Sequence, residues 1–145
     1  MVKFSWTKNY FDIATNQYVE TKAQYDLMGN LRYAWDGSNN LSQMEYSATY
    51  DYAYPTKTIS PVPASTGTYG SNAAFETTAA FDYNTGLPTS TTDINGQTTQ
   101  MSYADPVTGV VDPLWRIRKV TAPNGHQTIT EYGAGTSAST RWVKV

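Results

Sequence analysis

An aromatic residue followed by aspartate recurs along this 145-residue chain. The pair occurs as Tyr25-Asp26, Tyr50-Asp51 and Phe81-Asp82, and in a looser form as Tyr103-Ala104-Asp105. Recurrence of one short pattern is typical of proteins that stack copies of a single supersecondary unit, because each copy buries a face against its neighbours. The chain is therefore expected to be a series of similar units.

Turn sequences punctuate these units. A glycine follows the aromatic-aspartate pair at Gly29 and Gly86, and a second turn follows a few residues later, at Asp36-Gly37, Asn95-Gly96 and Asn124-Gly125. Asn-Gly and Asp-Gly tolerate a positive φ at both central positions of a type I′ turn, whose twist matches the flanking strands of a hairpin. We therefore predict type I′ hairpin turns at these dipeptides.

The segments between the turns alternate as half-buried strands do. In 97–103, Thr99, Met101 and Tyr103 fall on one side and the intervening polar residues on the other. Similar segments run over 41–46 and 127–132, each ending in a tyrosine. The 12 Tyr and the abundant Thr favour strands, and no window has sustained helical spacing. The expected fold is all-β, with tandem β-hairpin repeats forming a continuous curved antiparallel sheet, as a segment of a shell or solenoid.

Composition excludes several classes of function. The net charge of −2 provides no electrostatic footprint for nucleic acid, and no apolar run is long enough to span a bilayer. Residues 1–19 lack the apolar core of a signal peptide. Cysteine is absent, which removes disulfides, thiolate nucleophiles and cysteine-bound zinc. No cofactor is expected.

The repeats divide the chain into three parts. Residues 1–18 are expected to be an N-terminal strand or lead-in, 19–132 the hairpin repeats, and 133–145 a C-terminal loop and strand. Within the repeats, the Pro/Ser/Thr/Gly-rich stretch 60–74 has little strand character and is interpreted as an insertion.

Taken together, these residues resemble the Tyr-Asp (YD) repeats of the rearrangement-hotspot (RHS) family, which includes shells of bacterial toxins and teneurins. The segment 25–31 matches the first half of the family unit, 81–99 matches nearly all of it, and 112–125 is similar to another copy, with Trp115 where a small residue is usual. The residues that carry the repeat are Tyr25, Asp26, Gly29, Tyr50, Asp51, Phe81, Asp82, Gly86, Asp93, Asn95, Gly96, Tyr103, Asn124, Gly125 and Tyr132.

The resemblance implies β-hairpins coiled into a hollow shell that encloses or presents another domain, in a secreted or cell-surface bacterial protein. It also implies partners: adjacent repeats of the same or a longer chain, or further copies joined through sheet edges. Two features depart from the family. The chain looks too short to close a shell, and the self-cleaving core segment of toxin members is not found. Asp105-Pro106 and Asp112-Pro113 lie inside ordinary repeats, so that activity is not expected here.

The sequence supports an enzymatic role less well than a structural one, and no catalytic residue is assigned. His126 is the only histidine, and it follows a turn where histidine is usually solvated. The aspartates recur beside turns, where a carboxylate caps backbone N–H groups, instead of forming a glycosidase pair. No Asp-x-Asp-x-Asp-Gly loop for calcium is present, so no metal site is assigned.

The aromatic residues leave an alternative open. Six of them are interpreted as strand residues that stack along the sheet: Tyr25, Tyr46, Tyr50, Phe81, Tyr103 and Tyr132. Trp6, Trp35, Trp115 and Trp142 do not share one repeat position. Exposed Trp and Tyr side chains can instead hold sugar rings, so the alternative is a secreted module that binds a glycan or another cell-surface ligand.

Overall fold

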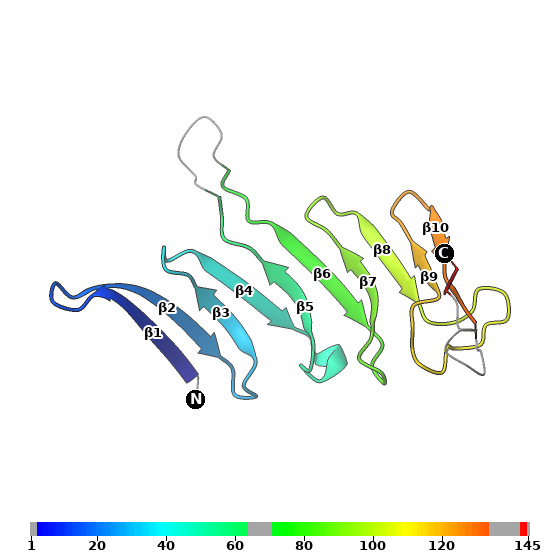
Figure 1. Ribbon diagram of the computed structural model, residues 1–145, viewed down its shortest axis with the longest axis horizontal. Helices are drawn as coiled ribbons and strands as arrows, with labels where there is room; N and C mark the ends of the chain where they lie inside the picture. Colours follow the sequence, from blue (N-terminus) through cyan, green and yellow to red (C-terminus); the bar gives the residue numbers. More distant parts are fainter. Residues whose placement is uncertain (1–2, 64–70, 134–142, 145) are drawn as a thin grey trace. The chain divides into compact units, whose positions relative to one another are not determined.

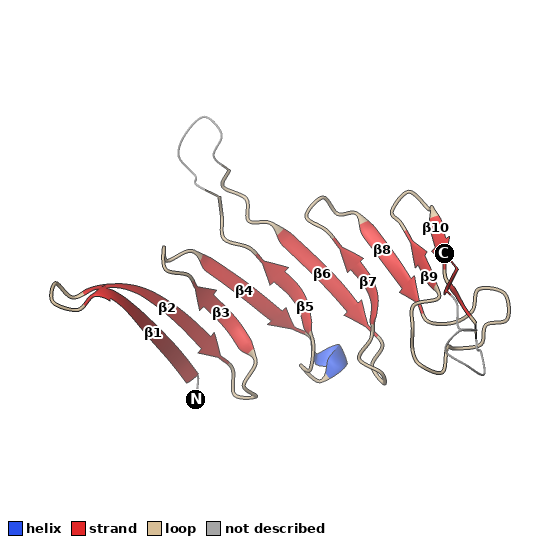
Figure 2. Cartoon of the chain, viewed as in Figure 1, coloured by secondary structure: helices blue, strands red, loops and turns tan. Residues whose placement is uncertain are grey.

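The computed structural model confirms the all-β fold, and Figures 1 and 2 show strands throughout with a single short helical turn. It describes residues 3–63, 71–133 and 143–144. Among these residues no helix has the length and hydrophobicity needed to cross a bilayer. The elements are β1 Lys3–Asp12, β2 Gln17–Tyr25, β3 Leu31–Trp35, β4 Leu41–Tyr46, η1 Ala48–Tyr50, β5 Pro55–Ile59, β6 Glu76–Phe81, β7 Pro88–Thr92, β8 Thr98–Ser102, β9 Lys119–Thr121, β10 Gln127–Ile129, β11 Glu131–Tyr132 and β12 Val143–Lys144.

Strands β1 to β10 form an antiparallel sheet in which the strand order is the sequence order. Each strand thus pairs with its neighbours in the chain, as tandem hairpins require. In the described part of the chain β1 and β10 end this order without pairing with each other, so the sheet is open. The short strands β11 and β12 form a separate two-stranded sheet.

The chain divides into two compact units, with the division inside β6 after Thr78. In the first unit β1 and β2 form the longest hairpin, running from Lys3 opposite Tyr25 to Asp12 opposite Gln17. The β2–β3, β3–β4, β4–β5 and β5–β6 pairs continue the sheet. The second unit contains the β7–β8, β8–β9 and β9–β10 pairs.

No described apolar side chain is buried, which is unusual for a folded domain. Every residue of β1 except Asp12 is exposed, and the inner strands are only half-buried. The described sheet therefore has no second layer covering it.

The structure places the predicted segments as follows. The lead-in 1–18 contains all of β1 and the start of β2, so it forms the first hairpin together with the repeats. In the insertion 60–74, the residues outside 64–70 contain no strand, and 64–70 lie outside the described residues. Of the C-terminal segment 133–145, residues 134–142 and 145 are likewise outside them, including Trp142.

Candidate functional site

Three of the recurring aspartates cap short loops in the same way. The carboxylate of Asp26 accepts the backbone N–H groups of Met28 and Asn30, each at 2.9 Å, while the Asp26 carbonyl accepts the N–H of Gly29. The same arrangement recurs at Asp36, with Ser38, Asn39 and Asn40, and at Asp93, with Asn95, Gly96 and Gln97. Each carboxylate satisfies N–H groups that the tight loop removes from the strand ladder.

Asp82 and Asp105 cap a longer loop, with the sequence Asp-x-x-Thr-Gly. The carboxylate of Asp82 accepts the N–H groups of Asn84 and Thr85 and the Thr85 hydroxyl. Asp105 accepts the same three groups from Val107 and Thr108. Asp12 resembles them, because it accepts from Ala14, Thr15 N–H and the Thr15 hydroxyl, with Asn16 in the glycine position. The recurring carboxylates are thus structural caps.

The predicted type I′ turns are wrong, although the hairpins are present. A type I′ turn needs a positive φ at both central residues. Gly96 and Gly125 have φ of 74° and 82°, but Asn95 and Asn124 are not in the left-handed region, and at Asp36-Gly37 the positive φ falls on Asn39. These loops are instead type I turns followed by one left-handed residue, a form in which the aspartate can accept the loop N–H groups.

The loop that leads from β9 to β10 keeps this backbone without an aspartate. Ala122 occupies the capping position, where its carbonyl accepts the N–H of Gly125 at 2.9 Å. Asn124 supplies the side-chain acceptor, because its Oδ1 accepts the N–H of His126 at 3.0 Å. His126 therefore lies on the shoulder of a hairpin, as expected from its place after the turn.

Asp112 is the one buried residue of the described chain, at 7% exposure, and it caps a further loop. Its carboxylate accepts the N–H groups of Leu114 and Arg116 and pairs with the Arg116 guanidinium, with Nη2 at 2.7 Å. Trp115 occupies the left-handed position of this loop, with φ of 52°, where Asp26 and Asp82 have glycine. The small residue usual at this position is thus replaced by a strained tryptophan.

Replacing Trp115 with glycine is expected to destabilise the protein by about 1 kcal/mol, because loss of indole packing outweighs relief of the left-handed backbone. A left-handed residue with a Cβ costs ~1–2 kcal/mol, whereas Trp115 is 47% exposed, so about half of its side chain is covered and its removal costs about 3 kcal/mol. The midpoint of urea unfolding measures the change. Gly96→Ala is the matched control, since a Cβ there would contact nothing within 4 Å, and it should cost about 1 kcal/mol through backbone strain alone. Stabilisation by Trp115→Gly would show that the strain outweighs the contacts of the indole.

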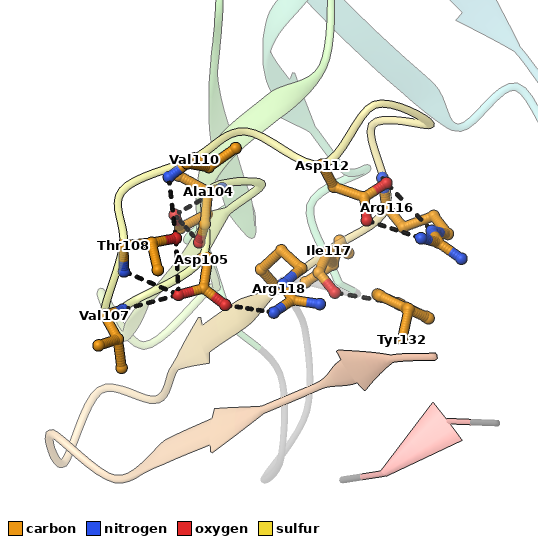
Figure 3. A network of polar contacts seen from close by, with 11 residues as sticks. Ala104, Asp105, Val107, Thr108, Val110, Asp112, Arg116, Ile117, Arg118 and Tyr132 are labelled. Atoms are coloured by element: carbon orange, nitrogen blue, oxygen red, sulfur yellow. Dashed lines mark hydrogen bonds and ion pairs between the residues drawn. The ribbon is translucent and has the colours of Figure 1, made fainter. Parts of the chain in front are cut away.

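Two ion pairs and a tyrosine join the Asp105 and Asp112 loops, as Figure 3 shows. Asp105 pairs with Arg118, and Asp112 with Arg116. Tyr132 lies beside both cations, with its ring centroid 3.9 Å from the Arg116 guanidinium carbon and 5.7 Å from that of Arg118. Its hydroxyl donates to the carbonyl of Ile117 at 3.0 Å. The network fixes the segment after β8 to the strands that follow.

Two of the predicted tyrosines, Tyr103 and Tyr132, form hydrogen bonds through their hydroxyls to backbone carbonyls. Tyr103 donates its hydroxyl to the carbonyl of Pro88 at 2.9 Å, as Tyr132 does to Ile117, and in both the acceptor lies 15 residues earlier. Tyr46 is the last residue of β4, and Tyr103 comes directly after β8. The Arg32 guanidinium carbon lies 5.6 Å from the centroid of the Tyr46 ring. Tyr25 and Phe81 are the last residues of β2 and β6, directly before their capping aspartates.

Tyr50-Asp51 occupies a different place from the other pairs. Tyr50 ends η1, and Asp51 is the left-handed residue that follows it, with φ of 49°. Ser47 is the capping residue of this turn, since its hydroxyl accepts the N–H of Thr49 at 3.1 Å. The corresponding pair in this repeat is therefore Tyr46-Ser47, which pattern matching on Tyr-Asp does not find.

The hydrogen bonds around the capping aspartates favour the ionised form of their carboxylates. Hydrogen bonds from the backbone N–H groups of Thr108 and Val107 and from Arg118 lower the pKa of Asp105 to about 2, and the hydrogen bond from Arg116 lowers the pKa of Asp112 to about 2. A general acid needs the opposite shift, toward neutral pH. In the described chain no three His, Asp or Glu side chains gather as metal ligands would.

No protein-family model matches the chain, and no curated protein matches it.

Proposed function

We propose that the chain is a non-catalytic structural segment of the RHS/YD type, part of a β-sheet that encloses or presents another domain in a secreted or cell-surface bacterial protein. The observation that carries the proposal is the uncovered sheet, which contains no buried apolar side chain among the described residues. A sheet is stable when one face is covered by another layer or by further strands. Neighbouring repeats or a second copy supply that cover in this proposal.

The repeated construction supports the same proposal. The capping carboxylates of Asp26, Asp82 and Asp105 accept N–H groups of their own loops, and those loops join consecutive strands. A side chain that repeats with the same partners in each unit serves the unit itself, and extension of such an array needs only another hairpin at its edge. In this proposal the specific activity is carried by the domain that the sheet encloses or presents.

The isolated chain is expected to self-associate through β1. This strand is ten residues long, lies at one end of the strand order, and its exposed edge offers unpaired N–H and C=O groups to another strand. Light scattering coupled to size-exclusion chromatography should give a mass above 16.0 kDa that falls on dilution. A mass that stays monomeric at every concentration, including millimolar, would contradict this prediction.

A pair of proline variants locates the contact. Of two neighbouring residues in a strand, one directs its N–H toward β2 and the other directs it away. Thr7→Pro and Lys8→Pro therefore differ: one breaks the β1–β2 ladder and lowers the unfolding midpoint, while the other blocks only the outer edge. The edge-blocking variant should keep the wild-type circular dichroism and be monomeric. Association that survives in both variants would show that β1 is not the contact.

A further inference from the structure

Aromatic and polar side chains form an ordered array on one face of the first unit. Trp6 lies opposite Lys22, which lies opposite Trp35; Phe4 lies opposite Gln24, which lies opposite Tyr33. Residues directly opposite each other in antiparallel strands share a face. These residues therefore form two aromatic rows, on β1 and β3, with a polar row on β2 between them; Figure 1 shows the three strands side by side.

Each aromatic row contains two neighbouring rings, one exposed pair on β1 and one half-buried pair on β3. The rings of Phe4 and Trp6 stack with centroids 5.7 Å apart and planes at 18°, and the side chains are 51% and 61% exposed. Tyr33 and Trp35 lie 6.1 Å apart with planes at 31°. Because adjacent strands are about 4.8 Å apart, the two rows are separated by roughly 10 Å. We call the six residues Phe4, Trp6, Lys22, Gln24, Tyr33 and Trp35 the aromatic platform.

Charges on the same face argue against an apolar protein layer as the occupant. Glu20 forms an ion pair with Lys22, at 3.1 Å, and another with Lys8, at 3.7 Å, beside the platform. Covering such a cluster with apolar side chains removes its water, a cost of several kcal/mol for each ion. A hydroxyl-rich ligand avoids this cost, because each hydroxyl can donate to a carboxylate and accept from an ammonium.

The opposite face of the unit has a different chemistry. Ser5 lies opposite Ala23, Ala23 opposite Ala34, and Ala34 opposite Ser42, which gives a row of small uncharged side chains across four strands. Small side chains let another layer approach the backbone closely. This row can pack closely against a protein layer, whereas the platform face combines aromatic rings with charged and amide groups.

We propose that the aromatic platform binds an extended, uncharged oligosaccharide. The apolar faces of its sugar rings stack on the Trp6 and Trp35 rows, and its hydroxyls bond to the Lys22 ammonium and the Gln24 amide between them. Stacking on aromatic rings supplies apolar contact, while the polar row fixes the direction of the sugar chain. This site goes beyond the scaffold role: it uses side chains on one face of β1, β2 and β3, whereas edge association uses the outer backbone groups of β1.

Isothermal titration with cellohexaose, and in parallel with xylohexaose and mannohexaose, tests the site. We expect saturable binding of at least one of the three, weakened at least tenfold by Trp6→Ala or Trp35→Ala and largely kept by Trp6→Phe. Trp115→Ala is the matched control, since it removes a similarly exposed tryptophan from the second unit. Circular dichroism confirms that each variant is folded.

Two results would overturn the proposal. One is absence of saturable binding of all three hexasaccharides by the folded wild-type chain. The other is equal affinity in wild type, Trp6→Ala and Trp35→Ala. If Trp6→Ala removes self-association instead, the platform faces a protein partner and the sugar site is rejected. Light scattering of the Thr7→Pro and Lys8→Pro variants measures self-association, whereas titration calorimetry measures sugar binding. Failure of the scaffold proposal can therefore be distinguished from failure of the sugar-binding proposal.

Discussion

Replacing Asp105 and Asp112 together with alanine is expected to lower the midpoint of thermal unfolding by about 10 °C. Both carboxylates accept loop N–H groups and hold an arginine, so their loss leaves donors and cations without acceptors. The side chain of Arg118 is only 12% exposed, and a cation with so little contact with water is costly without its partner. Differential scanning calorimetry measures the shift.

Two matched variants separate the contributions. Asp93→Ala removes a carboxylate that accepts the N–H groups of Asn95 and Gln97 and has no ion pair in the described part of the chain, and it should lower the midpoint by a few degrees. Asp112→Asn keeps an oxygen for the loop N–H groups and removes the charge that holds Arg116. An unchanged midpoint in the Asp105/Asp112 double variant would contradict a structural role for the network in Figure 3.

Acid is expected to destabilise the protein strongly between about pH 5 and pH 2. Asp105 and Asp112 have a pKa of about 2 in the folded protein against an ordinary value of 3.8, and the pKa values of Asp12, Asp36 and Asp82 are also lowered by hydrogen bonds to their loops. The folded state therefore binds fewer protons than the unfolded state in this window. The stabilisation is fully present above the unfolded-state pKa and is lost as pH falls through the folded-state values.

Urea unfolding midpoints measured from pH 7 to pH 2 test this dependence. The midpoint should be nearly constant above pH 5 and fall steadily below it. The Asp105/Asp112 double variant should show a shallower fall, because it lacks the two carboxylates with the largest shifts. A wild-type midpoint independent of pH down to 2 would mean that the caps contribute no net stability.

Local sequence was sufficient for the all-β class and for the hairpins. Turn residues and period-two alternation act over a few residues, so the strand 98–102 and the turn at Gly96 follow from the chain itself. The structural role expected of Asp26 and Asp82 also follows, because a short carboxylate beside a turn has backbone N–H groups within reach.

The turn type, the Ser47 cap and the Asp105–Arg118 pair depend on contacts that local sequence patterns do not reveal. Asn-Gly is compatible with both type I′ turns and type I turns with a left-handed third residue, and the choice depends on where the preceding aspartate finds its donors. Ser47 replaces aspartate as the capping residue, so a search for Tyr-Asp pairs does not detect the unit that begins there. Pairing of Asp105 with Arg118 joins residues 13 apart and requires the intervening loop to fold back.

Hydrogen exchange of the β1 amides at different protein concentrations tests the central claim most directly. If the chain is an open repeat sheet completed by further strands, the outward amides of β1 exchange rapidly in dilute solution and become protected as concentration rises. The amides of β3 and β8, which have strands on both sides, should be protected throughout. Equal, concentration-independent protection of every β1 amide would contradict the account, since it would mean that the sheet is already complete in a single chain.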